Sequence, residues 1–115
     1  MRQIFVFGSN LAGVHGAGSA REALDKHGAL YGVGSGLTGN SYAIPTKDAN
    51  IKTMRLDEIK PYIREFLGFA KVNPEMQFSI VAIGCGLAGY TPKQIAPMFE
   101  GASENCVFIG DWNLA

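Results

Sequence analysis

Two glycine-rich stretches follow short apolar runs in this sequence, and their residues are the first candidates for chemistry. Residues 8–18 include Gly16-Ala17-Gly18, and residues 84–90 read Gly-Cys-Gly-Leu-Ala-Gly-Tyr. Glycine lets the main chain approach a ligand closely, and the N–H groups at the start of a following helix point towards anions. Because a predicted helix follows each stretch, the two together predict a cradle for two phosphates of one ligand.

Glycine also permits tight turns, and for either loop alone that interpretation is equally good. The presence of two such loops favours phosphate binding. The sequence contains no GxxxxGK[ST] pattern, and the segment that starts at Gly16 lacks the third glycine of GxGxxG. Kinase-like and ordinary NAD-dehydrogenase functions are therefore disfavoured.

Alternating strands and helices must position these loops. Apolar runs predict strands at 4–7, 41–44, 78–83 and 106–109, and helical spacing predicts helices at about 17–27, at about 56–72 and from Thr91 to Gly101. The second strand is expected to end before Pro45, and residues 31–40 show no regular pattern. The sequence thus predicts one α/β domain over residues 1–115, a three-layer α/β/α sandwich with a mixed, mainly parallel sheet.

Composition disfavours several other classes of protein. The net charge is zero and 17% of the residues are charged, so the basic surface that dominates nucleic-acid binding is missing. Cys85 and Cys106 are isolated and only two histidines accompany them, which indicates neither a disulfide framework nor a metal site. No run of apolar residues is long enough to span a membrane. We expect a cytoplasmic protein without a cofactor, whose partner is a small-molecule nucleotide rather than nucleic acid or a membrane; the oligomeric state is left open.

Three parts of the chain carry a resemblance to a known family: residues 7–10 with 15–20, residues 42–47, and residues 83–89, which read Ile-Gly-Cys-Gly-Leu-Ala-Gly. They resemble the macrodomains, and most closely the branch of terminal ADP-ribose protein glycohydrolases and ADP-ribose phosphate phosphatases. The third part is the most specific. The resemblance covers most of the chain and implies a macrodomain-like fold, of the small kind expected in a phage or bacterial member, that binds ADP-ribose or a derivative of it.

The resemblance also implies catalytic residues, and here the sequence departs from the branch. In its glycohydrolases the lysine of a Thr-Lys pair attacks the ribose, and an aspartate directly after GCGL acts as acid and base. Lys47 follows Thr46, but Ala88 occupies the aspartate position. Loss of that carboxylate removes a group worth about 10²- to 10⁴-fold in rate. Hydrolysis of ADP-ribosyl or ADP-ribose phosphate bonds with Lys47, His15 or Asp48 is thus the alternative to simple binding, and enzymatic activity stays open.

The predicted ligand-binding residues lie on three loops and at two aromatic positions near strand ends. They are Gly8, Ser9, Asn10, His15, Gly16, Ala17, Gly18, Thr46, Lys47, Gly84, Cys85, Gly86, Leu87, Ala88, Gly89, Tyr90 and Trp112. Lys47 and His15 are also the candidate catalytic residues, and no metal ligand is predicted.

Each of these residues also has a structural interpretation. Asn10 can satisfy a turn, His15 can be a buried structural histidine, Cys85 can fill the core, and Tyr90 and Trp112 can close it. A protein-interaction domain that binds no nucleotide is the third functional hypothesis, because a fold alone does not determine function.

Overall fold

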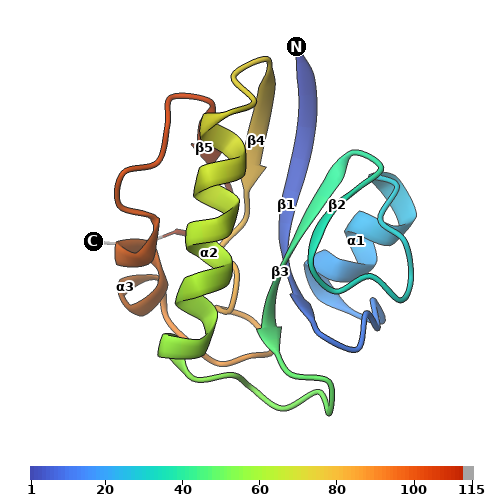
Figure 1. The fold of residues 1–115 in the computed structure, drawn as a ribbon. Coiled ribbons are helices and arrows are strands. Elements are labelled where there is room, and N and C mark those ends of the chain that lie inside the picture. Colours follow the sequence, from blue (N-terminus) through green and yellow to red (C-terminus); the bar gives the residue numbers. More distant parts are fainter. Residues whose placement is uncertain (113–115) are drawn as a thin grey trace.

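Five strands form one mixed sheet, and helices lie on both of its faces (Figure 1). The computed structural model describes residues 1–112. In chain order the elements are β1 (Arg2–Asn10), α1 (Gly18–Lys26), β2 (Gly36–Thr38), β3 (Ser41–Lys47), α2 (Leu56–Lys71), β4 (Met76–Ile80), α3 (Pro92–Ile95), the 3-10 helix η1 (Ala96–Phe99) and β5 (Cys106–Phe108). The strand order is β2-β3-β1-β4-β5, with only β2 antiparallel to its neighbour. The predicted α/β sandwich with a mixed, mainly parallel sheet is confirmed.

Strand β1 lies at the centre of the sheet and is buried on both faces. Successive side chains of a strand point to opposite faces. Ile4 and Val6 therefore join the core beneath α2 and α3, whereas Phe5 and Phe7 join a smaller core beneath α1. Figure 1 shows α2 and α3 on one side of the sheet and α1 on the other. This two-sided burial explains why the strand reads as an uninterrupted apolar run.

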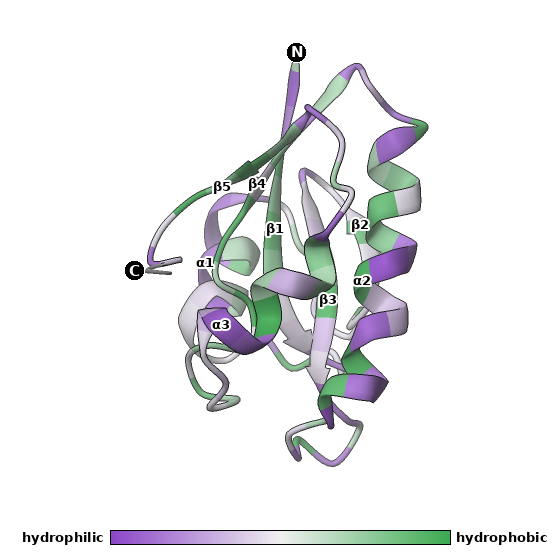
Figure 2. Ribbon diagram, turned by 90° about the vertical axis from the view of Figure 1, so that its left-hand side faces the viewer, coloured by the Kyte–Doolittle hydropathy of each residue, from purple (hydrophilic) through white to green (hydrophobic). Residues whose placement is uncertain are grey.

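Helix α2 forms because apolar residues recur along one of its faces. Its buried residues are Ile59, Ile63, Phe66, Leu67 and Ala70. Hydrophobic and hydrophilic patches alternate along the helix in Figure 2, as burial of a single face requires. The helix matches its predicted range to within one residue. None of the helices in residues 1–112 is long and apolar enough to cross a membrane.

The third predicted helix is shorter than expected. It begins with the predicted capping box, in which the Thr91 N–H donates to Oε1 of Gln94 at 2.9 Å. The α-helical part ends at Ile95 and continues as η1, because Pro97 has no N–H to donate to the carbonyl four residues earlier.

Strand β4 also differs from its prediction, since it ends at Ile80 rather than at residue 83. The Ile83 N–H donates to the Val81 carbonyl at 2.7 Å. This tight turn takes the chain out of the sheet and into the glycine-rich loop at residues 84–89.

The predictions for residues 31–47 were wrong in two respects. β3 does not end before Pro45 but continues to Lys47. β2 pairs only with residues 41–43, so Pro45 faces no β2 partner and its missing N–H breaks no ladder there. β2 itself was not predicted. Its signal in the sequence was Gly39-Asn40, a two-residue pair typical of hairpin turns, flanked by apolar and β-branched residues.

The segment before β2 packs directly on the end of β1. Gly34 is buried there, and a Cβ atom at this position would overlap the carbonyl oxygen of Asn10 and lie 2.9 Å from its carbonyl carbon. The Ser9 hydroxyl donates to the Gly34 carbonyl across the same contact. The two main chains thus touch with no room for a side chain between them.

We expect Gly34→Ala to lower the free energy of unfolding by about 2–3 kcal/mol, because the added methyl group must push two backbone segments apart. Gly68→Ala is the matched control. Gly68 lies in α2 with open space around its Cβ position, so alanine there should stabilise the protein by about 0.5–1 kcal/mol. Urea denaturation of both variants measures the difference, and equal stability would contradict the close contact.

Candidate ligand-binding site

A cavity of about 450 Å³ lies where β1 and β3 end. It is lined by Gly8, Ser9, Asn10, Val14, Gly16, Ala17, Gly18, Ser19, Ala20, Thr46, Lys47, Ile51, Ala82, Ile83, Gly84, Gly86, Leu87 and Ala88. The volume falls in the range of small-molecule sites. In open α/β sheets, ligands bind at the edge where the strands present their carboxyl ends, and this cavity lies at that edge.

The cavity brings together most of the predicted ligand-binding residues from all three loops, which are separated by up to 80 positions in the chain. The predicted residues that do not line it are His15, Cys85, Gly89, Tyr90 and Trp112. Sequence reasoning missed six lining residues: Val14, Ser19, Ala20, Ile51, Ala82 and Ile83. Five of these are near neighbours of predicted residues. Ile51 alone comes from a turn that carried no chemical signal.

An irregularity in the ladder between β1 and β3 positions Lys47. After Ser9 the register shifts, so that Asn10 pairs with Lys47 and Thr46 is skipped. Such bulges change the direction of side chains near the ends of strands. The Leu11 N–H donates to the Lys47 carbonyl at 2.9 Å and fixes its main chain. The half-buried Lys47 thus lines the cavity from the last position of β3.

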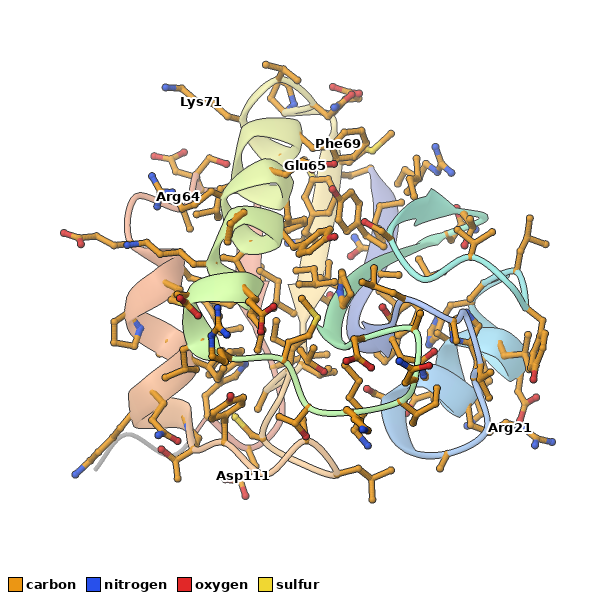
Figure 3. All side chains as sticks on the ribbon, turned by 60° about the horizontal axis from the view of Figure 1, so that its bottom comes forward. Arg21, Arg64, Glu65, Phe69, Lys71 and Asp111 are labelled. Carbon is orange, nitrogen blue, oxygen red and sulfur yellow. The ribbon has the colours of Figure 1, made fainter. Side chains whose placement is uncertain are left out.

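Lys47 is the only charged residue that lines the cavity within residues 1–112. The ion pairs of this described region lie elsewhere, on α1 and around Arg55. Figure 3 brings forward the end of the molecule at which β1 and β3 finish, and there Arg21 extends outward from α1. Its guanidinium pairs with Asp25 on the same helix at 2.9 Å. Among residues 1–112, the lining of the cavity therefore includes one cationic side chain and no carboxylate.

The loop at residues 84–89 borders the cavity and contains main-chain N–H groups without hydrogen-bond acceptors. The Cys85 N–H donates to Ala82 and the Gly89 N–H donates to Gly86, which folds the loop into two tight turns. Within the described chain, the N–H groups of residues 86–88 have no acceptor. Consecutive N–H groups without acceptors are what an anion-binding concavity made of main-chain atoms requires.

The first turn of α1 lines the cavity as well. Gly18, Ser19 and Ala20 form this turn, and Ala17 before them provides no side-chain cap. The first N–H groups of a helix have no partner inside the helix, and they carry the positive end of its dipole. Main-chain N–H groups without a partner therefore border the cavity both in α1 and in the 84–89 loop.

Asn10 is engaged by its own loop. Its Nδ2 donates to the Val14 carbonyl at 2.8 Å, and the Val14 N–H donates back to Oδ1 at 3.0 Å. The structure therefore shows the turn-stabilising role, while contact with a ligand stays a prediction. This reciprocal pair holds Val14 at the mouth of the cavity.

His15 is buried beneath the cavity loop instead of facing the cavity. Its side chain is 1% exposed, and its Nε2 lies 3.1 Å from the carbonyl oxygens of both Leu30 and Val33. Because both partners are acceptors, Nε2 is the donor in these contacts. Nδ1 has no hydrogen-bond partner in the described chain, and the ring meets Phe7 edge-on. This geometry gives no support to the predicted catalytic role and favours the structural interpretation of His15.

Asp48, the remaining candidate for hydrolysis, serves the turn that follows β3. Its Oδ1 accepts the N–H groups of Asn50 at 2.8 Å and Lys52 at 3.0 Å. Asp48 does not line the cavity. Together with alanine at position 88, this means that the lining residues that the structure describes include no carboxyl group for acid or base catalysis.

Tyr90 and Trp112 both close the core. The Tyr90 hydroxyl donates to the Met54 carbonyl, and Nε1 of Trp112 donates to the Ile80 carbonyl at 2.9 Å. The indole also packs edge-on against Phe99. Their predicted contact with a ligand finds no counterpart in the lining of the cavity.

A second cavity lies behind the 84–89 loop. It is lined by Ala82, Cys85, Gly86, Pro92 and Asp111, and it shares Ala82 and Gly86 with the first cavity. Figure 3 shows Asp111 on the same end of the molecule. Burial and then the negative charge of Asp111 raise the pKa of the Cys85 thiol, so the thiol form is favoured and Cys85 is a poor nucleophile.

No group of three or more histidine, cysteine, aspartate or glutamate side chains within residues 1–112 is placed to hold a metal ion. A scan against protein-family models matches no family, and searches of curated proteins and of solved structures find no significant similarity. The resemblance to macrodomains therefore stays a prediction from the three sequence segments.

The raised pKa of Cys85 makes a testable prediction. Alkylation by iodoacetamide, followed for the peptide that contains Cys85 by mass spectrometry, should reach its half-maximal rate at a higher pH than free cysteine in the same solution. Asp111→Asn should move this midpoint to lower pH, because it removes a negative charge that disfavours the thiolate. A midpoint below that of free cysteine would show instead that the thiol is activated.

Proposed function

We propose that the chain binds ADP-ribose or a related ADP-ribose-derived nucleotide in the cavity at the ends of β1 and β3. The observation that carries the proposal is the convergence of main-chain donors on this cavity. The free N–H groups of residues 86–88 and the first turn of α1 both border it, and Lys47 adds one positive charge.

Phosphate oxygens are the groups that such donors suit best. Main-chain N–H groups at a helix start bind anions without a basic side chain, since the helix dipole and the donors act together. A single lysine then supplies the remaining positive charge. A cavity without carboxylates does not repel the ligand, so a diphosphate meets favourable groups on two sides.

The two cavities support an elongated ligand. Their linings share two residues, Ala82 and Gly86. A molecule with a central diphosphate and a bulky group at each end fits this division, because its charged middle lies against the loop and its ends enter separate spaces. ADP-ribose has this form, and the resemblance of the loop sequences to macrodomains makes it the first ligand to test.

Binding without turnover is the expected behaviour. Acid and base catalysis requires a titratable group within hydrogen-bonding reach of the reacting bond. His15 is buried beneath the loop, Asp48 holds its own turn, and Ala88 has no carboxyl group. Lys47 is left as a ligand for phosphate or ribose oxygens.

Calorimetric titration with ADP-ribose tests the proposal, with the same samples analysed by chromatography for products. Lys47→Ala should weaken binding about tenfold to a hundredfold, the usual value of a hydrogen bond to a charged group. Lys52→Ala is the matched control, because Lys52 is exposed in the next turn and does not line the cavity. It should leave the dissociation constant unchanged.

Three other outcomes would change the assignment. Turnover that disappears in Lys47→Ala would make the protein a hydrolase that acts on ADP-ribosyl or ADP-ribose phosphate bonds. If Lys47→Ala and Lys52→Ala weaken binding of ADP-ribose equally, the binding site does not lie in this cavity. If calorimetry detects no heat of binding with millimolar ADP-ribose or with its phosphorylated and cyclic relatives, the result would favour a protein-interaction domain that binds no nucleotide.

A further inference from the structure

Three exposed aliphatic side chains surround the cavity that holds these polar donors. They are Val14, Ile51 and Leu87, whose side chains are 39%, 43% and 75% exposed, and all three line the cavity. Each comes from a different loop. Large apolar side chains scattered singly over a surface need no explanation, but three that converge from separate loops on one cavity form an apolar rim.

Ile51 is held in this rim against its backbone preference. It is the only residue other than glycine with a positive φ, 62°, in the described chain. A β-branched residue is strained in this left-handed region, where glycine or asparagine is normally found. Backbone strain of this kind persists only where the surrounding structure holds it in place, and it is found preferentially at ligand sites.

The turn that carries Ile51 is tightly determined. Oδ1 of Asp48 accepts two N–H groups of the turn, and the Ile51 N–H donates to the Asp48 carbonyl at 3.1 Å. The Thr53 hydroxyl then donates to the Ala88 carbonyl at 3.1 Å. This bond ties the turn to the loop of Leu87, so the two loops that carry Ile51 and Leu87 are held together beside the cavity.

We propose that the rim of Val14, Ile51 and Leu87 is the seat for an uncharged planar ring that the ligand carries beside its phosphate groups. The inference rests on the proposed function and adds to it the chemical class of a second contact. The donors and Lys47 account for the charged part of a nucleotide, whereas a ring that covers these three side chains removes apolar surface from water.

The ring has two possible sources in a nucleotide of this class. It is either the adenine of ADP-ribose itself or a second heterocycle beyond the distal ribose. ADP-ribose and NADH separate these sources, because both contain adenine and only NADH adds an uncharged dihydronicotinamide ring.

Ile51→Gly and Leu87→Ser test the rim, and Val72→Ser is the matched control. Val72 is also an exposed aliphatic residue, 74% exposed, but it follows α2 and lies outside the cavity. We expect each rim variant to raise a dissociation constant about three- to tenfold, as loss of apolar contact requires. Ile51→Gly should also raise the melting temperature or leave it unchanged, because glycine accepts a positive φ.

The pattern of the losses identifies the ring. Equal weakening of ADP-ribose and NADH places adenine on the rim, whereas weakening of NADH alone places the second ring there. In a protein labelled at its isoleucine and leucine methyl groups, nuclear Overhauser effects should connect Ile51 and Leu87 with protons of that ring. This measurement needs no substitution and holds even where a variant folds poorly.

Two results would overturn the inference. In the first, the wild-type protein binds either nucleotide, the rim variants have the same dissociation constants as Val72→Ser, and the methyl groups contact only ribose protons. The rim then holds no ring, and the proposed function still stands. If the wild-type protein binds neither nucleotide, the proposed function fails and the inference fails with it.

Discussion

The close contact between two stretches of main chain holds the candidate site together. The end of β1 and the segment before β2 touch at Gly34, where a Cβ atom would overlap the Asn10 carbonyl. The Gly32 N–H donates to the Gly13 carbonyl at 2.8 Å a short distance away, and the buried His15 ring bridges to the same segment. These contacts fix the loop between β1 and α1, and that loop forms one wall of the cavity.

His15 shows how a residue near a ligand site can serve the architecture. Its ring fills the space between Phe7 and the 30–33 segment, and its Nε2–H is shared by two carbonyl oxygens. The unpartnered Nδ1 is part of the cost of this arrangement, because a buried polar atom without a hydrogen-bond partner loses its hydration. The loop above it, with Gly16 and Ala17, gains a fixed position over the ends of the strands.

The sequence predicted the parts of the fold that follow from repeated patterns. Apolar runs located β1 and β4, although not their ends, helical spacing located α1 and α2, and the Thr91–Gln94 capping box located the start of α3. It did not predict β2 or the continuation of β3 through Pro45, because each depends on which strand lies alongside. The site was predicted to a similar extent. The glycine-rich loops and the end of β3 predicted most of the residues that line the cavity. The burial of His15 depends on tertiary contacts, and the position of Ile51 in the lining depends on the geometry of its turn.

The free N–H groups of residues 86–88 have a consequence for how this protein tolerates change. A binding surface made of main-chain atoms is present whatever side chains the loop carries, provided that the backbone keeps its path. Alanine substitutions along this loop would therefore remove few of its hydrogen bonds and would underestimate its contribution. The residues that control it are those that set the path, such as Gly84, where φ is +71° and an added Cβ would lie 3.2 Å from Ile95. The binding that we propose at this loop therefore depends on the shape of its backbone more than on the identity of its side chains.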